Sequence, residues 1–149
     1  FEEGKPFMFK NIMVVFDETK LAPKALTTAI DITQHYEDAT LHICHVNVIS
    51  GDMQVHANDS EPLTEVLEDS GRRVMNLALD IVEKYDVNYQ AHILPGGTVV
   101  KPLLKFMKDN NIDLLVVASR GLGLVRQALG SVSHHLAEES PVPVMIVKE

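Results

Sequence analysis

The chain has 149 residues, of which 46% are hydrophobic and 23% are charged, and its formal net charge is −8. That length suits one ordinary domain, and both fractions lie near the globular average, which argues against wholesale disorder. The 13 Lys and Arg against 21 Asp and Glu argue against a protein that binds nucleic acid or anionic membranes over its whole surface. The single cysteine, Cys44, excludes an intrachain disulfide and a multi-cysteine metal site.

The chain has neither an apolar stretch near the roughly 20 residues that span a bilayer nor a hydrophobic signal segment. We therefore expect a cytoplasmic protein with no membrane partner. Residues 1–8 are expected to be an N-terminal extension or a remnant of expression, and residues 9–149 a single domain. The apolar neighbours of Cys44 favour a buried, inert thiol.

Five short apolar segments are predicted to be strands. Most are continuously apolar rather than alternating, a pattern typical of strands that are covered on both faces in a parallel sheet. The predicted strands cover residues 9–16, 40–48, 87–94, 114–118 and 144–147.

Between these strands, apolar residues recur at helical spacing, which predicts helices. One helix is expected with Pro23 in its first turn, a long one from Leu63, a third from Val100 and a short one from about Ser131 that ends before Pro141. A polar loop is expected over residues 49–62, and Pro95 and the two following glycines are expected to close the third strand. The alternation predicts a single three-layer α/β domain with a parallel sheet.

In such sheets ligands bind beyond the carboxyl ends of the strands, where the strand order reverses. The loop after the fourth strand has the richest chemistry, because Gly121, Gly123 and Gly130 permit close backbone approach and Ser131 is a good N-cap. From Ser119 to Ala137 the chain has two arginines, two histidines and no acidic residue. This pattern indicates an anion site at a helix N-terminus. The alternative is that the glycines only turn the loop and the arginines are solvated.

Asp17, at the end of the first strand, has two interpretations. It either caps the following helix or accepts hydrogen bonds from a ligand amine or sugar hydroxyl. The adjacent His134 and His135 lack metal-ligand spacing, and His42 and His45, three apart on a strand, are expected on opposite faces in structural roles. No catalytic constellation is identified.

Several segments together resemble the universal stress protein family. They are the first strand ending in Val-Val-Phe-Asp-Glu-Thr (14–19), His45-Val46, Asp-Leu-Leu-Val-Val-Ala-Ser-Arg-Gly (113–121), Gly-Ser-Val-Ser (130–133) and Pro-Val-Pro-Val-Met-Ile-Val (141–147). The resemblance extends over residues 9–149 and implies a five-stranded parallel sheet in the order 3-2-1-4-5 flanked by four helices. It also implies a homodimer that pairs the last strand (Val144–Val147) with its copy.

The resemblance further implies a dimeric stress-response protein that binds ATP, ADP or AMP as a sensor or regulator, with Mg²⁺ as the companion ion. The adenine contacts of the family correspond to Val15, Asp17 and Val46. Its phosphate and ribose contacts correspond to Val117, Ala118, Arg120, Gly121, Gly130, Ser131, Val132 and Ser133.

The chain departs from the ATP-binding pattern of the family, which is Gly, two residues, Gly, nine residues and Gly-Ser/Thr. Ala118 replaces the first glycine, and only eight residues separate Gly121 from Gly130. Family members without this pattern exist that do not bind ATP. The alternative function is therefore a protein-interaction module without a nucleotide; slow nucleotide hydrolysis is a third hypothesis, for which no general base is evident.

Overall fold

The computed structural model describes residues 3–4, 8–48, 63–119 and 130–149. Its sheet has five parallel strands in the order β3-β2-β1-β4-β5. The strands are β1 (Asn11–Val15), β2 (Thr40–Val48), β3 (Tyr89–Gly96), β4 (Leu114–Ala118) and β5 (Val144–Val147). The predicted α/β class and strand order are confirmed.

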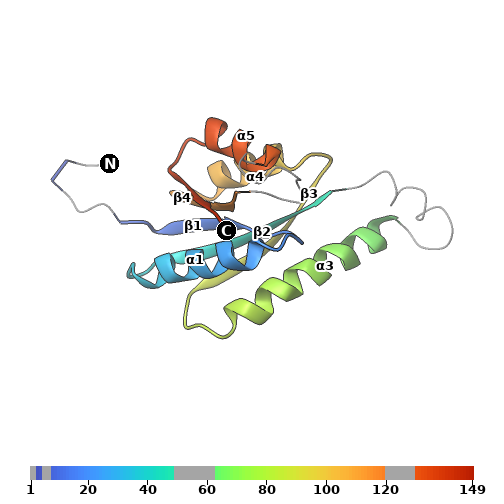
Figure 1. Ribbon diagram of the computed structural model, residues 1–149, viewed down its shortest axis with the longest axis horizontal. Helices are drawn as coiled ribbons and strands as arrows, with labels where there is room; N and C mark the ends of the chain where they lie inside the picture. Colours follow the sequence, from blue (N-terminus) through green and yellow to red (C-terminus); the bar gives the residue numbers. More distant parts are fainter. Residues whose placement is uncertain (1–2, 5–7, 49–62, 120–129) are drawn as a thin grey trace.

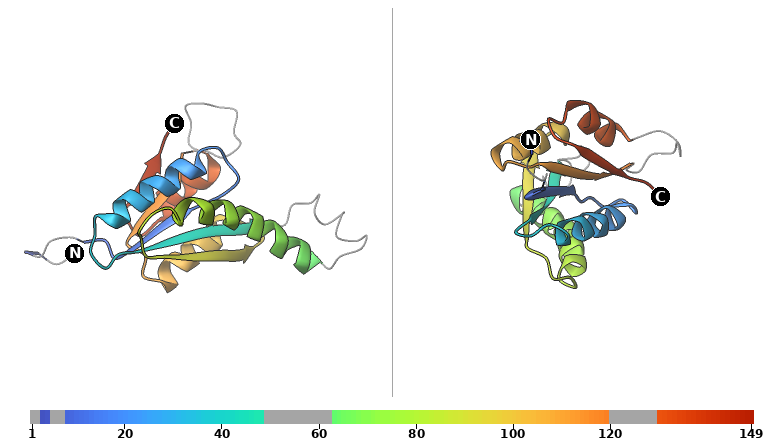
Figure 2. Two further views of the ribbon diagram at one scale, coloured as in Figure 1. Left: turned by 90° about the horizontal axis from the view of Figure 1, so that it is seen from below. Right: turned by 90° about the vertical axis from the view of Figure 1, so that its left-hand side faces the viewer.

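Helices cover both faces of the sheet (Figure 1). Helices α1 (Ala22–Gln34) and α3 (Leu63–Val82) lie on one face, and α4 (Val100–Asp109) and α5 (Ser131–Glu139) lie on the other. Figure 2 shows the same three layers from two further directions. No helix in the described part of the chain is long and apolar enough to cross a membrane.

Strands β1 and β4 are apolar on both faces because each face contacts a different helical layer. In β1, Ile12 and Val14 are fully buried with residues of α1 and α3. Met13 and Val15 pack on the opposite face with residues of α4 and α5. At roughly 25 cal/mol per Å² of apolar surface, burial of both faces is the main stabilising contribution to this sheet.

The edge strand β3 differs from its prediction. It covers Tyr89–Gly96 rather than 87–94, so Pro95 lies inside the strand rather than closing it. Pro95 is opposite Asn47 in the register with β2. A proline is tolerated here because β3 is an edge strand, where alternate N–H groups have no partner strand. The first strand is also shorter than predicted, Asn11–Val15 rather than 9–16.

Gly96 ends β3 at a point of close backbone approach. A Cβ built on this residue would lie 2.6 Å from Cγ of Pro102 and 2.9 Å from the carbonyl oxygen of Thr98. A proline ring and a backbone oxygen cannot easily move away. For Gly97, the next residue, no atom lies within 4 Å of the corresponding position.

We therefore predict that Gly96→Ala lowers the free energy of unfolding by about 1–3 kcal/mol, the usual range for overpacking. Gly97→Ala is the matched control, and we expect it to change this free energy by less than about 0.5 kcal/mol. Urea denaturation of both variants measures the difference. Equal stabilities for the two variants would contradict the close approach.

Two histidines form a hydrogen-bonded pair beneath α4. Nδ1 of His42 lies 3.2 Å from Nε2 of His92, and Nε2 of His42 lies 3.2 Å from Oδ1 of Asn11. The ring of Phe106 packs against both imidazoles. Because the Asn11 oxygen accepts, His42 carries its hydrogen on Nε2 and its Nδ1 accepts from His92. The predicted structural role of His42 matches this arrangement.

Burial lowers the pKa of His42 and of His92 below the ordinary value of 6.5. The neighbouring His92 lowers the pKa of His42 further, whereas the Asp113 carboxylate raises it. At these two groups the unfolded chain therefore binds more protons than the folded protein between their lowered pKa values and the ordinary value of 6.5.

We predict that the free energy of unfolding is insensitive to these two groups above their ordinary pKa of 6.5 and decreases as the pH falls below it. Replacing the pair by His42→Leu and His92→Leu together should flatten this dependence between about pH 7 and pH 5. Urea denaturation at each pH measures it. The control is His35→Gln, whose side chain is 72% exposed. A double variant with the wild-type slope would refute the assignment.

Candidate functional site

The carboxyl ends of β1 and β4 are adjacent in the sheet and carry several of the predicted site residues. Val14 of β1 pairs with Val116 of β4, so the two strands end side by side. Val15, Val117 and Ala118 are buried there. The buried strands hold the backbone of this edge in place, and Asp17 after β1 and Ser119 after β4 supply polar groups to it.

Asp17 follows β1 and forms a local turn. Its Oδ1 accepts a hydrogen bond of 3.0 Å from the Thr19 N–H and a second one from the Thr19 hydroxyl. The N-cap of α1 is Leu21, with no side-chain cap hydrogen bond. The interpretation of Asp17 as a helix cap is therefore wrong: its carboxylate stabilises the turn before α1, an Asx-turn.

Hydrogen bonds to Ser119 join the end of β4 to the start of α5. The Gly130 N–H donates to the carbonyl oxygen of Ser119 at 2.7 Å. The buried Ser133 hydroxyl lies 2.8 Å from the same oxygen and 2.9 Å from that of Gly130. The Ser119 N–H donates to Val147 of β5 at 2.8 Å. These contacts hold Ser119 and Gly130 together; residues 120–129 between them lie outside the described part.

The N-terminus of α5 differs by one residue from its prediction. Gly130 is the N-cap, with an extended backbone at φ −62° and ψ 157°, and Ser131 is the first helical residue. The prediction of Ser131 as N-cap is therefore wrong. Gly130 has no side chain, so no side-chain cap hydrogen bond forms, and the first turn has no acidic residue. The N–H groups of a first helical turn have no partner within the helix and favour an anion.

Two further predicted residues, Val46 and Val132, lie near this edge. Val46 of β2 is buried beyond the last β1–β2 pair, Val15 with Cys44. Val132 is half-buried in the first turn of α5. Arg120 and Gly121 lie outside the described residues.

Sequence reasoning assigned Ser133 to the phosphate and ribose contacts but missed Ser119 and the hydrogen bond between the two serines. Both are buried polar residues, with 6% and 2% exposure. Their contact joins residues 14 positions apart, so no local periodicity predicts it. The available sequence signal for this contact was Ser133 itself, a serine at the third position of a helix whose N-cap is a glycine.

The other reactive residue types are placed in structural roles. Burial raises the pKa of the Cys44 thiol well above its usual range, which makes it a poor nucleophile. His134 lies 3.4 Å from Oε1 of Glu138 in an exposed pair on α5. Within residues 3–4, 8–48, 63–119 and 130–149, no three or more His, Cys, Asp or Glu side chains form a group that could hold a metal ion.

The sequence profile of the universal stress protein family matches residues 8–148. The chain belongs to this family. A curated relative, the universal stress protein YxiE of Bacillus subtilis, is 27% identical over 150 residues, which cover 95% of this chain and 100% of YxiE. A second, MJ0531 of Methanocaldococcus jannaschii, is 26% identical over 144 residues, 95% of this chain and 84% of MJ0531.

Solved structures of family members share the fold. Universal stress protein UspA from Lactobacillus plantarum has a TM-score of 0.76 at 20% identity and covers 96% of this chain and 100% of its own. An Arabidopsis thaliana member with AMP bound has a TM-score of 0.64 at 18% identity, covering 94% and 92%. An Archaeoglobus fulgidus member in complex with dAMP has a TM-score of 0.66 at 16% identity, covering 95% and 100%.

Proposed function

We propose that this universal stress protein binds an adenine nucleotide at the edge formed by β1, β2, β4 and the N-terminus of α5. One observation carries the proposal: hydrogen bonds to Ser119 hold the N-terminus of α5 at the end of β4, the strand that pairs with β1, and the first turn of α5 has no acidic residue. Family members of this fold have been solved with AMP and dAMP. The nucleotide would regulate a dimeric, cytoplasmic stress-response protein.

Three residues would form the adenine side of the site. The Asp17 carboxylate would accept a hydrogen bond from the exocyclic amine of the base. Its Oδ1 already accepts from Thr19, and a carboxylate has further lone pairs to offer. The buried side chains of Val15 and Val46 would contribute apolar surface for the ring.

The phosphates and ribose would bind along the end of β4 and the start of α5. Helix N–H groups and a glycine N-cap favour close approach of an anion. The residues assigned to this part are Val117, Ala118, Arg120, Gly121, Gly130, Ser131, Val132 and Ser133. A nucleoside triphosphate would bring Mg²⁺ bound to its own phosphates, as is usual for that ion.

The direction of the Ala118 side chain supports this assignment despite the missing glycine. Ala118 is buried with the core on the α1 side of the sheet, whereas Val117 belongs to the core on the α5 side. The extra methyl group therefore packs away from α5. We infer that Ala118 leaves the space in front of the helix N-terminus open.

We predict that the double variant Gly130→Val and Ser131→Ala abolishes binding of ATP and AMP, because it places a branched side chain beside the N–H groups of α5. Isothermal titration calorimetry measures this binding. As a matched control, Gly97→Val with Ser140→Ala changes the same residue types elsewhere, and we expect wild-type affinity. Unchanged affinity in the first double variant would reject the site.

A protein-interaction module without a nucleotide is the alternative, and the altered glycine pattern is the observation that favours it. A ligand that binds only the folded state raises the midpoint of thermal unfolding. A higher midpoint with Mg-ATP or AMP supports the nucleotide site. An unchanged midpoint at millimolar nucleotide supports the interaction module.

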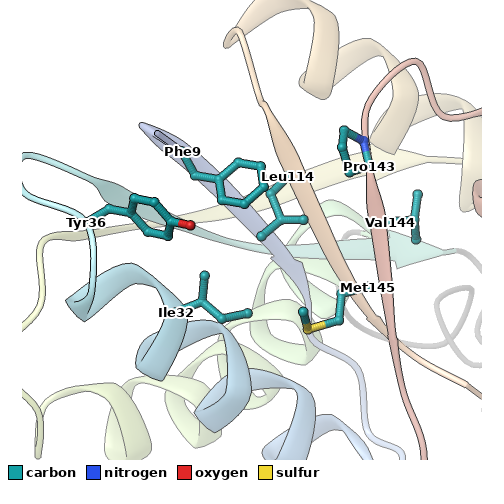
Figure 3. Close-up of a pocket in the computed structure, with 7 residues that line it drawn as sticks. All are labelled: Phe9, Ile32, Tyr36, Leu114, Pro143, Val144 and Met145. Carbon is teal, nitrogen blue, oxygen red and sulfur yellow. The ribbon is translucent and has the colours of Figure 1, made fainter. Parts of the chain in front are cut away.

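We also propose a homodimer through β5. This strand is at the edge of the sheet, and Met145 on it is 40% exposed. An apolar groove of about 480 Å³ adjoins it, lined by Phe9, Tyr36 and Pro143 among others (Figure 3). An apolar edge strand beside an apolar groove favours pairing with another chain.

We predict that Met145→Lys shifts the protein from dimer to monomer, because the charge would be buried between the copies. The matched control is Ile93→Lys on the opposite edge strand β3, where Ile93 is 39% exposed. Size-exclusion chromatography with light scattering gives the mass of each. Dimers in the Met145 variant, or monomers in the wild type, would contradict an interface at β5.

A further inference from the structure

The imidazole of His45, a residue of β2, contacts the backbone of the segment that follows β1. Its Nδ1 lies 3.0 Å from the carbonyl oxygen of Phe16. Because a carbonyl oxygen only accepts hydrogen bonds, Nδ1 carries the hydrogen. The contact spans 29 positions of the sequence and joins β2 to the residue that directly follows β1.

This hydrogen bond occurs where β1 leaves the sheet. The last β1–β2 pair is Val15 with Cys44, and the Phe16 N–H still donates to the carbonyl oxygen of Cys44 at 2.8 Å. Beyond this point β2 continues to Val48, paired with β3. In a parallel ladder the Phe16 carbonyl would next accept from a backbone N–H of β2. The His45 side chain supplies a donor to this oxygen.

The contact determines the orientation of the peptide group before Asp17. The Phe16 oxygen and the Asp17 nitrogen belong to one planar peptide unit. A hydrogen bond to that oxygen therefore restrains the plane from which the Asp17 side chain projects. The Thr19 N–H and hydroxyl restrain the carboxylate itself. Among the described residues Oδ2 of Asp17 has no hydrogen-bond partner, which leaves it available to a ligand.

We propose that His45 is a positioning residue for base recognition, which holds the Asp17 carboxylate where it reads the exocyclic amine of the base. This inference rests on the proposed nucleotide site. Adenine presents an amine donor at this position, whereas hypoxanthine presents a carbonyl acceptor that a carboxylate repels. The position of Asp17 therefore sets the preference for AMP over IMP.

Two substitutions separate positioning from packing. His45→Asn retains a donor, because the amide nitrogen is as many bonds from Cβ as Nδ1 of histidine. His45→Leu has a similar branched shape and no donor. We expect His45→Leu to lower the ratio of AMP to IMP affinity about three- to tenfold, the usual effect of one hydrogen bond, and His45→Asn to retain the wild-type ratio.

Calorimetric titrations with AMP and IMP measure this ratio. A role in packing alone would lower both affinities equally and leave the ratio unchanged in His45→Leu. That outcome, or a ratio in His45→Asn as low as in His45→Leu, would overturn the proposal.

A measurement without nucleotide distinguishes this proposal from the proposed function. In ¹H–¹⁵N spectra of the free protein, His45→Leu should shift the amide resonances of Asp17 and Thr19, and His45→Asn should leave them near their wild-type positions. If these shifts occur and the wild type binds neither nucleotide, the nucleotide site is wrong and positioning of Asp17 by His45 stands. Unshifted resonances in His45→Leu overturn the positioning role whatever the titrations show.

Discussion

The central position of β1, between β2 and β4, is the constraint on which the rest of the fold depends. Its parallel pairing with both neighbours buries four of its five residues, Ile12 to Val15, between two helical layers. The strand order reverses at the β1–β4 pair, because β2 and β3 lie on one side and β4 and β5 on the other. The helices that follow β1 and β4, α1 and α5, consequently lie on opposite faces of the sheet, and a ligand can bind at the edge between them.

At the end of β4, hydrogen bonds rather than apolar contacts join the strand to α5. The Ser119 carbonyl accepts from the Gly130 N–H and from the Ser133 hydroxyl. Both serines are buried, and every buried side-chain polar atom of the described residues has a partner. Because unpaired buried polar groups are costly, these contacts fix where α5 begins. The helix dipole then directs partial positive charge at the same edge.

Histidines of β2 connect the apolar strands to this polar edge in two different ways. His42 faces the α4 layer and is held between Asn11 and His92. His45 projects from the other face of the strand and reaches the carbonyl of Phe16. Successive side chains of a strand point to opposite faces of the sheet. One strand therefore supports both the core under α4 and the turn that carries Asp17.

The sequence by itself determined the fold class, the strand order and three strand boundaries, β2, β4 and β5. These follow from the apolar runs of the strands and from the family resemblance, which needs no knowledge of tertiary contacts. Only the tertiary structure decided that Pro95 lies within an edge strand, that Gly130 rather than Ser131 caps α5, and that Asp17 forms a turn with Thr19. It also decided the contacts of Ser133 with Ser119 and of His45 with Phe16. The physical reason is that apolar periodicity is a local property of the chain. A hydrogen bond between residues 14 or 29 positions apart depends on how the strands are packed.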